Sequence, residues 1–181
     1  MRKLVHAIYV SLDGVVAEPA WTGPFFNDEL AALQHQLLFA SDALVLGRVT
    51  YEGFAAAWPT MTHEGDFAVR MNTMPKHVAS RTLTTTTWNA ELLPDDPVAA
   101  VAELKQAPGG DLLLYGSPTV ANALSAAGVV DEYRIMLFPT VVGSGGARLF
   151  AGVADTAFGL EGVITTSTGV AVLTYRRADA R

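Results

Sequence analysis

The chain contains no cysteine among its 181 residues. This absence excludes disulfides, catalysis by a thiolate and metal sites built from cysteine, and it favours a reducing cytoplasm as the location. Positive charge is also scarce, because 12 Lys and Arg stand against 18 Asp and Glu, which gives a formal net charge of -6. An acidic chain without a basic run is a poor candidate for binding nucleic acid or an anionic membrane surface.

Long hydrophobic runs are missing as well. The N-terminal segment begins with positive charge, as a signal peptide does, but Asp13 and Gly14 interrupt its apolar stretch. No segment reaches the apolar length of about 20 residues that spans a bilayer. Half of the residues are nevertheless hydrophobic and only 17% are charged, which is too apolar for disorder. We therefore expect a soluble cytoplasmic protein in which residues 1–181 form a single domain.

Two strand-to-helix junctions, about 70 residues apart, are the most informative feature that is present. In residues 43–52 and 111–120, a short apolar run ends in a glycine, Gly47 or Gly116, and a helix start follows at once. Such a turn lets backbone N–H groups approach an anion, with the positive end of a helix dipole behind them. Two of them in a small chain suggest a phosphate-rich ligand, such as a dinucleotide, that spans two helix N-termini.

The order of elements predicts an α/β fold. Strands are expected at 3–10, 43–46, 77–80, 84–88, 111–115 and 132–138, with helices at 27–40, 50–58, 96–107 and 117–127. A polar loop with one helical turn near 67–71 is expected at 59–74. Alternation of strands and helices favours a mostly parallel sheet with helices on both faces. Residues 158–167 and 170–177 resemble a hairpin around Thr168-Gly169, which would add an antiparallel edge.

Each candidate binding residue has an ordinary alternative role. Arg48 either binds a second phosphate, such as a ribose 2′-phosphate, or is a solvated arginine in a turn. Ser117 either lies under a pyrophosphate or simply caps the helix that starts at Pro118. Ser80 and Arg81 end a strand, where an anionic group would bind in a crevice, but they equally fit a polar loop.

Familiar nucleotide and catalytic motifs are absent. No Gly-x-Gly-x-x-Gly follows a strand, and the chain has neither a phosphate-loop Gly-Lys-Ser/Thr nor a Gly-x-Ser-x-Gly elbow. The four histidines lack metal-ligand spacing, so no metal site is expected. Asp13, in the turn Ser11-Leu12-Asp13-Gly14, is the candidate proton donor or substrate anchor, because the pKa of its carboxyl would be raised if it faced a pocket between apolar neighbours. Its alternative role is that of an ordinary Asp-Gly turn residue.

Several stretches together resemble the dihydrofolate reductase superfamily, and in particular the branch of the C-terminal reductase domain of bifunctional riboflavin biosynthesis proteins. The most specific are the Gly-Arg-x-Thr-Tyr-Glu piece at 47–52 and the Pro-Thr-Val-Val-Gly-x-Gly-x-x-Leu-Phe region at 139–150. Weaker matches at 11–17, 74–83 and 115–117 occur in the family's order. The resemblance implies a dihydrofolate-reductase-like three-layer α/β/α fold and a homodimer.

The resemblance also implies NADPH as the hydride donor and assigns residues to it. Gly47, Arg48 and Thr50 would bind phosphates on the adenosine side, and Ser80 and Arg81 would lie near the 2′-phosphate. Gly116, Ser117 and Thr119 would bind the pyrophosphate. The backbone near Tyr9 and Val16 would hold the nicotinamide carboxamide.

The sequence departs from both reference enzymes. The helix at 27–40 carries no carboxylate beyond its first turn, unlike true dihydrofolate reductases. These residues also lack the Cys-x-x-Cys motif of the zinc deaminase that is usually fused to the riboflavin-pathway enzyme, so we expect a stand-alone reductase. We expect an NADPH-dependent reductase of a pyrimidine, pterin or related heterocycle, with 5-amino-6-(5-phosphoribosylamino)uracil reductase of riboflavin synthesis as the named candidate. Arg70, Lys76 and the loop at 143–148 are the expected cations for a substrate phosphate. The alternatives are a reductase of another small carbonyl or imine compound and a non-catalytic nucleotide-binding protein.

Overall fold

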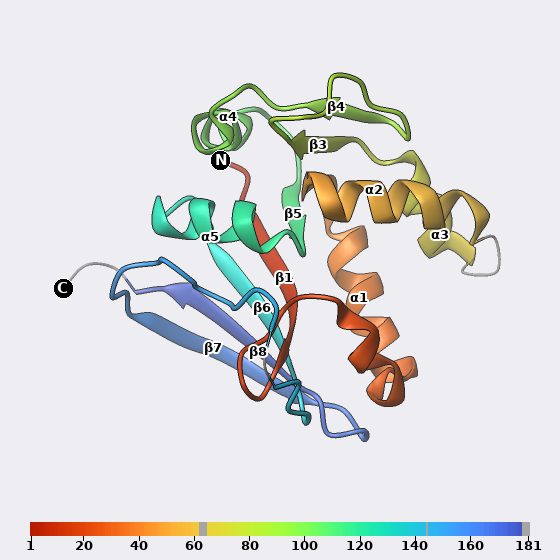
Figure 1. Cartoon of the computed structure of the whole chain (residues 1–181), viewed down its shortest axis with the longest axis vertical. Helices are drawn as coiled ribbons and strands as arrows, with labels where there is room; N and C mark the ends of the chain where they lie inside the picture. The colour runs from red at the N-terminus through yellow and green to blue at the C-terminus, as the bar shows by residue number, and fades with distance from the viewer. Residues whose placement is uncertain (62–64, 144, 179–181) are drawn as a thin grey trace.

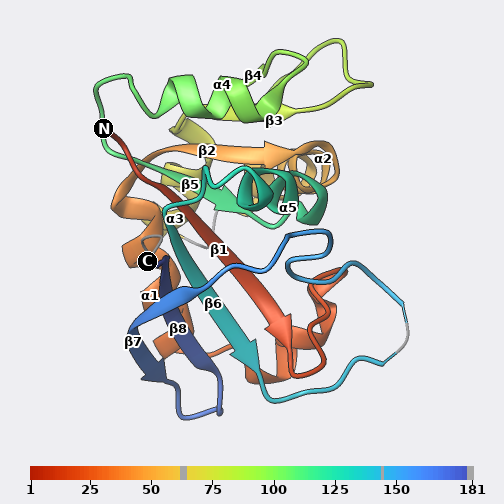
Figure 2. The ribbon, with the colours of Figure 1, turned by 90° about the vertical axis from the view of Figure 1, so that its left-hand side faces the viewer.

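One eight-stranded sheet organises the molecule, in the order β4-β3-β2-β5-β1-β6-β8-β7 (Figures 1 and 2). The computed structural model describes residues 1–61, 65–143 and 145–178. Strands β1 to β6 pair with one another in parallel, and β8 pairs antiparallel with β6 and β7. The strands are β1 (Leu4–Ser11), β2 (Ser41–Gly47), β3 (Lys76–Ala79), β4 (Ala90–Leu92), β5 (Asp111–Tyr115), β6 (Glu132–Phe138), β7 (Phe158–Thr165) and β8 (Ala171–Arg177).

Helices cover both faces of this sheet and give it two hydrophobic cores. The helices are α1 (Asp28–Phe39), α2 (Arg48–Ala57), α3 (Gly65–Thr73), α4 (Pro97–Leu104) and α5 (Pro118–Ala126), with 3-10 turns η1 (Pro19–Phe25) and η2 (Trp58–Thr60). Leu30 of α1 and Met71 of α3 are buried in one core, and Val101 of α4 and Leu124 of α5 in the other. The expected three-layer α/β/α architecture with an antiparallel C-terminal hairpin is therefore confirmed.

Strands β2 and β5 have continuous apolar sequences because both of their faces are buried. Leu44, Val45 and Leu46 of β2 are fully buried, as are the three leucines of β5, because helices pack on both sides of these neighbouring strands. Parallel pairing of β2 with β5 brings their C-terminal ends together at one edge of the sheet. The two glycine turns are consequently neighbours in space, although about 70 residues separate them in sequence.

Two local predictions were wrong. In the expected polar loop at 59–74, the single helical turn predicted near 67–71 is the nine-residue helix α3, whose length the sequence pattern does not indicate because only Ala68 and Met71 are buried. The expected strand at 84–88 is irregular, and β4 begins at Ala90 instead. Trp88 and Asn89 adopt φ values of 55° and 51°, a left-handed conformation that a strand cannot contain.

Candidate functional site

A cavity of about 1470 Å³ opens where the carboxyl ends of β1, β2, β3 and β5 meet the N-termini of α2 and α5. The structure brings all ten residues that the sequence assigns to a cofactor to its wall: Tyr9, Val16, Gly47, Arg48, Thr50, Ser80, Arg81, Gly116, Ser117 and Thr119. They come from four strand ends. The carboxyl ends of parallel strands are the usual ligand position in α/β sheets.

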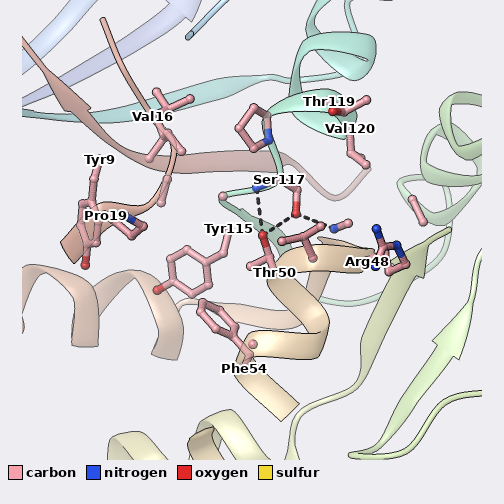
Figure 3. A pocket seen from close by; sticks show the side chains of 18 of the residues that line it. Tyr9, Val16, Pro19, Arg48, Thr50, Phe54, Tyr115, Ser117, Thr119 and Val120 are labelled. Atoms are coloured by element: carbon pink, nitrogen blue, oxygen red, sulfur yellow. Dashed lines mark hydrogen bonds between the residues drawn. The ribbon is translucent and has the colours of Figure 1, made fainter. Parts of the chain in front are cut away.

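The two glycine turns are hydrogen-bonded to each other (Figure 3). The backbone N–H of Gly47 donates to Ser117 Oγ over 2.6 Å, and Ser117 Oγ donates to Thr50 Oγ1 over 2.9 Å. The backbone N–H of Ser117 also donates to Thr50 Oγ1, over 3.1 Å. We call this set of three residues the turn lock. It fixes the position of one turn relative to the other.

Close packing in the turn lock requires both glycines. A Cβ added to Gly47 would lie 2.9 Å from Ser117 Cβ and Oγ, a distance that real Cβ atoms essentially never show. Gly116 has φ of 53°, and a Cβ there would lie 3.1 Å from Thr50 Oγ1. The glycines therefore serve close backbone approach and a left-handed turn, as their place after each strand predicted.

Among the described residues, no side chain caps the first turn of α2 or of α5, and both turns face the cavity. Ser117 is at the N-cap position of α5, as expected, but its hydroxyl does not cap the helix. It accepts a hydrogen bond from the backbone N–H of Gly47 instead. The amides of Thr119 and Val120 are thus left for another acceptor. Two uncapped helix N-termini, both with dipoles directed at one cavity, form a favourable place for phosphate groups.

Arg48 and the Ser80-Arg81 pair lie on the same side of the cavity and bring positive charge to it. Arg48 Nη1 donates to Glu52 one helical turn later, over 2.8 Å, and its side chain is partly exposed. Ser80 Oγ accepts from the backbone N–H groups of Thr82 and Leu83, which holds the turn that presents Arg81. A solvent-facing arginine pair beside an uncapped helix start suits an exposed phosphate.

Aromatic side chains dominate the other end of the cavity, which Figure 3 shows between Tyr9 and Phe54. The lining here includes Tyr9, Gln34, Phe54, Trp58 and Tyr115. Of these residues, only Tyr9 was identified from the sequence, and that for its backbone. One signal was available, because Gln34 is a polar residue on the apolar side of α1, between Leu30 and Leu38, and all three are buried.

Asp13 does not line this cavity. Its Oδ1 accepts from Ser11 Oγ over 2.6 Å and from the backbone N–H of Val142, and its Oδ2 accepts from the backbone N–H of Gly143. The Ser11 hydroxyl and these amides lower the pKa of Asp13 to about 2. The expected raised pKa is therefore wrong, and Asp13 joins the end of β1 to the loop after β6.

Arg70 and Lys76 are also absent from the cavity wall, in contrast to the substrate-binding role expected of them. Arg70 Nη2 donates to the carbonyl of Ser41 over 2.5 Å at the start of β2. Lys76 is fully buried, where Nζ donates to the carbonyl of Met74 over 2.6 Å and lies 4.1 Å from the ring centre of Trp88. Burial lowers the pKa of Lys76 to about 8. Both cations hold α3 against the sheet.

Two other site classes find no support in the described part of the chain. No three His, Asp or Glu side chains gather there in a way that could hold a metal ion. None of its helices is both long and apolar enough to cross a bilayer.

Comparison with known proteins supplies the family context. A family model described as the RibD C-terminal domain matches residues 2–172. The uncharacterized protein YyaP of Bacillus subtilis (strain 168) is 31% identical over 96% of this chain and 94% of its own. Among solved structures, a protein from Shewanella sp. PV-4, named as a candidate riboflavin biosynthesis protein, has a TM-score of 0.79 at 23% identity, covering 98% of this chain and 99% of that one. Dihydrofolate reductase from Enterococcus faecalis, complexed with NADP(H), has a TM-score of 0.67 at 15% identity, covering 98% and 97%.

Proposed function

The chain belongs to the RibD C-terminal domain family, a family of NADPH-using, pyrimidine-reductase-like enzymes, and we propose that it is itself an NADPH-dependent reductase of a small heterocycle. The observation that carries this proposal is the turn lock between two uncapped helix N-termini at one end of a cavity whose other end is aromatic. A phosphate-rich cofactor fits the first end, and a flat ring fits the second.

The residues present fit NADPH at the phosphate end. The free amides of Thr119 and Val120 would hold the pyrophosphate, and Arg48 with Ser80-Arg81 would hold the 2′-phosphate that distinguishes NADPH from NADH. The backbone of Tyr9 and Val16 would hold the carboxamide. When bound, NADPH supplies the hydride. The chain's own contribution is to orient the two reactants and to exclude water from the aromatic end.

The substrate that we propose is a pyrimidine, a pterin or a related heterocycle with a reducible C=N or C=O. The named candidate is 5-amino-6-(5-phosphoribosylamino)uracil, the compound that the reductase of riboflavin synthesis acts on. It needs a cation for its phosphate, and Arg70 and Lys76 are engaged elsewhere. Arg148, from the third expected source, lines a smaller adjoining cavity of about 410 Å³ beside α5, and its Nη1 donates to the backbone carbonyl of Asp13. A small carbonyl or imine compound without phosphate is the second candidate, which the occupied Arg70 and Lys76 favour.

Titration with NADPH tests the cofactor directly. We expect NADPH to quench tryptophan fluorescence and to raise the melting temperature, and NADH to do so more weakly. Oxidation of NADPH, followed by absorbance, is then measured across a panel of heterocycles with and without a ribose phosphate. Failure to bind NADPH would end the reductase proposal, whereas binding without oxidation of any compound would favour the non-catalytic nucleotide-binding alternative.

We further propose a homodimer, as the family resemblance implies. The outer strand β7 supports it, because Leu160, Val163 and Ile164 are all exposed on this edge of the sheet. An apolar edge strand left open invites pairing. Sedimentation velocity of the wild type and of Val163→Glu tests this, with a dimer expected for the first and a monomer for the second. A monomeric wild type at micromolar concentration would overturn the dimer.

A further inference from the structure

Three polar side chains, two of them buried and Tyr9 partly buried, form one chain of hydrogen bonds at the aromatic end of the cavity. Tyr115 Oη donates to Gln34 Oε1 over 3.2 Å, and Gln34 Nε2 donates to Tyr9 Oη over 2.7 Å. Gln34 and Tyr115 are only 7% and 8% exposed. The three residues come from α1, β5 and β1, and all of them line the cavity. Such a fully formed polar set among apolar side chains has a defined geometry.

Met136 sets the direction of this chain. Its Sδ lies 3.6 Å from Gln34 Nε2, and a thioether sulfur can accept a hydrogen bond but cannot donate one. The amide nitrogen of Gln34 must therefore face Met136 and Tyr9, and its oxygen must face Tyr115. Reversing the amide would place its oxygen against the sulfur, two acceptors in contact.

One hydroxyl hydrogen remains at the end of the chain. Tyr9 Oη accepts from Gln34, so its own hydrogen must find another acceptor, and no described residue provides one. Burial raises the pKa of both Tyr9 and Tyr115, which keeps both hydroxyls protonated at neutral pH. An unpaired O–H on the wall of a cavity is a donor that awaits a ligand.

Carboxylates are placed unfavourably for a cationic ligand at this end. Within residues 1–61, 65–143 and 145–178, the carboxylates that line the cavity are Glu18, Asp66 and Asp95, and all three are exposed. Asp66 is moreover paired with His35, at 3.0 Å between Oδ2 and Nε2. No described lining residue therefore offers a buried carboxylate to a protonated ring at the aromatic end, where an unpaired charge is costly.

We propose that the Tyr9 hydroxyl donates a hydrogen bond to the carbonyl oxygen or ring nitrogen of an uncharged heterocyclic substrate. Gln34 and Tyr115 are positioning residues that aim this donor. The substrate class is then a neutral, uracil-like ring and not a protonated, diaminopyrimidine-like one. This inference rests on the proposed reductase function, because it assigns the aromatic end of the cavity to the substrate.

Binding of two probes to the NADP⁺-loaded protein tests the inference. The probes are 5-aminouracil, which is neutral, and 2,4-diaminopyrimidine, which is measured at a pH where it is protonated. Calorimetry is expected to show tighter binding of 5-aminouracil by the wild type. Tyr9→Phe should weaken that binding about tenfold, the loss typical of one hydrogen bond, and should change NADP⁺ affinity less than twofold because the backbone is kept.

Tyr115→Phe is the matched control, since it removes the same group one step further along the chain. Gln34 still donates to Tyr9 in this variant, so we expect a loss of only about twofold. Infrared spectra of ¹³C-carbonyl-labelled 5-aminouracil give a second readout. The bound carbonyl stretch should shift to lower frequency in the wild type and Tyr115→Phe, and less in Tyr9→Phe.

Unchanged 5-aminouracil binding in Tyr9→Phe would overturn the role of the hydroxyl. Tighter binding of the protonated probe, or binding of neither probe by the NADP⁺-loaded wild type, would overturn the substrate class. These failures differ from failure of the reductase proposal, which is decided by whether the wild type binds and oxidises NADPH at all.

Discussion

Two pairs of helices in this molecule begin in opposite ways. Asn27 Oδ1 accepts from the backbone N–H of Leu30 at the start of α1, and Asp96 Oδ1 accepts from those of Val98 and Ala99 at the start of α4. The starts of α2 and α5 have no such contact. Ala31 and Pro97 show that the first turns of α1 and α4 also reach the cavity wall, but side chains already satisfy their amides, whereas the first turns of α2 and α5 stay open for a ligand.

The largest effect is expected from Gly47→Ala, which disrupts the packing between the two uncapped helix starts, those of α2 and α5. Its Cβ would lie 2.9 Å from Ser117 and 3.1 Å from Val120 Cγ2, so the start of α5 must shift. We expect unfolding free energy to fall by about 1–3 kcal/mol and NADPH affinity to fall at least about tenfold. Urea titration and fluorescence titration measure the two losses.

Gly53→Ala, in the same helix, is the control for that substitution. Nothing lies within 4 Å of a Cβ at Gly53, so this variant should be more stable than the wild type by about 0.5–1 kcal/mol. If Gly47→Ala behaved like Gly53→Ala, the close packing of the turn lock would carry no energetic weight.

His6 lies near Gly116, at the turn before α5, and makes the stability of the protein dependent on pH. It is buried on β1 near Gly116, and neither of its ring nitrogens has a hydrogen-bond partner in the described residues. Burial lowers its pKa to about 4, against about 6.5 in the unfolded chain. The unfolded state therefore takes up the proton first, and stability should fall by about 3 kcal/mol as the pH drops from 6.5 to 4.

Urea unfolding at pH 7.0, 5.5 and 4.5 follows this loss. His6→Leu keeps a buried side chain without a titrating group, so its stability should fall less over the same pH range. Parallel pH profiles of the two proteins would contradict the assignment to His6.

Removing the arginines near α2 separates their contribution to NADPH binding from that of the backbone amides at the helix starts. Arg48→Ala combined with Arg81→Ala should weaken NADPH binding about tenfold and leave NADH binding nearly unchanged, because only the 2′-phosphate differs. Lys3→Ala, which removes an exposed charge away from the cavity, is the control. An equal loss for NADH would mean that the arginines do not select the 2′-phosphate.

The smallest effect on NADPH binding is expected from substitutions at the capped helix starts, those of α1 and α4. Asp96→Ala should cost about 1 kcal/mol of stability, typical of a lost cap, and should leave NADPH affinity within twofold. Ser117→Ala, at the same cap position of α5, should instead weaken NADPH binding, because the Gly47 amide loses its acceptor. Equal binding losses in the two variants would erase the distinction between the helix pairs.

The sequence predicted the parts that depend on local pattern. Apolar runs ending in glycine located β2 and β5, and Asn27 and the Asp96-Pro97 pair located two helix starts. It could not reveal that Ser117 bonds to Gly47, because that contact depends on which strands are neighbours. The same limit explains Arg70 and Lys76, whose charge suggested a ligand but whose partners are backbone carbonyls brought close by folding.

Asp13 shows the limit most clearly. Its neighbours in sequence are apolar, which predicted a raised pKa, yet two amides from the loop after β6 and the Ser11 hydroxyl reverse the sign. Gln34 is the opposite case, because a buried polar residue on an apolar helix side was visible in the sequence and marked a real part of the cavity wall.

The turn lock also constrains how the chain can vary among relatives. Residues 47, 50 and 117 share one set of hydrogen bonds, so a change at any of them alters what the other two can be. A larger side chain at 117 requires glycine at 47 to remain, and loss of the hydroxyl at 50 leaves the Ser117 amide without its acceptor. Drift at these three positions is therefore expected to be concerted, with substitutions appearing in pairs across an interval of about 70 residues.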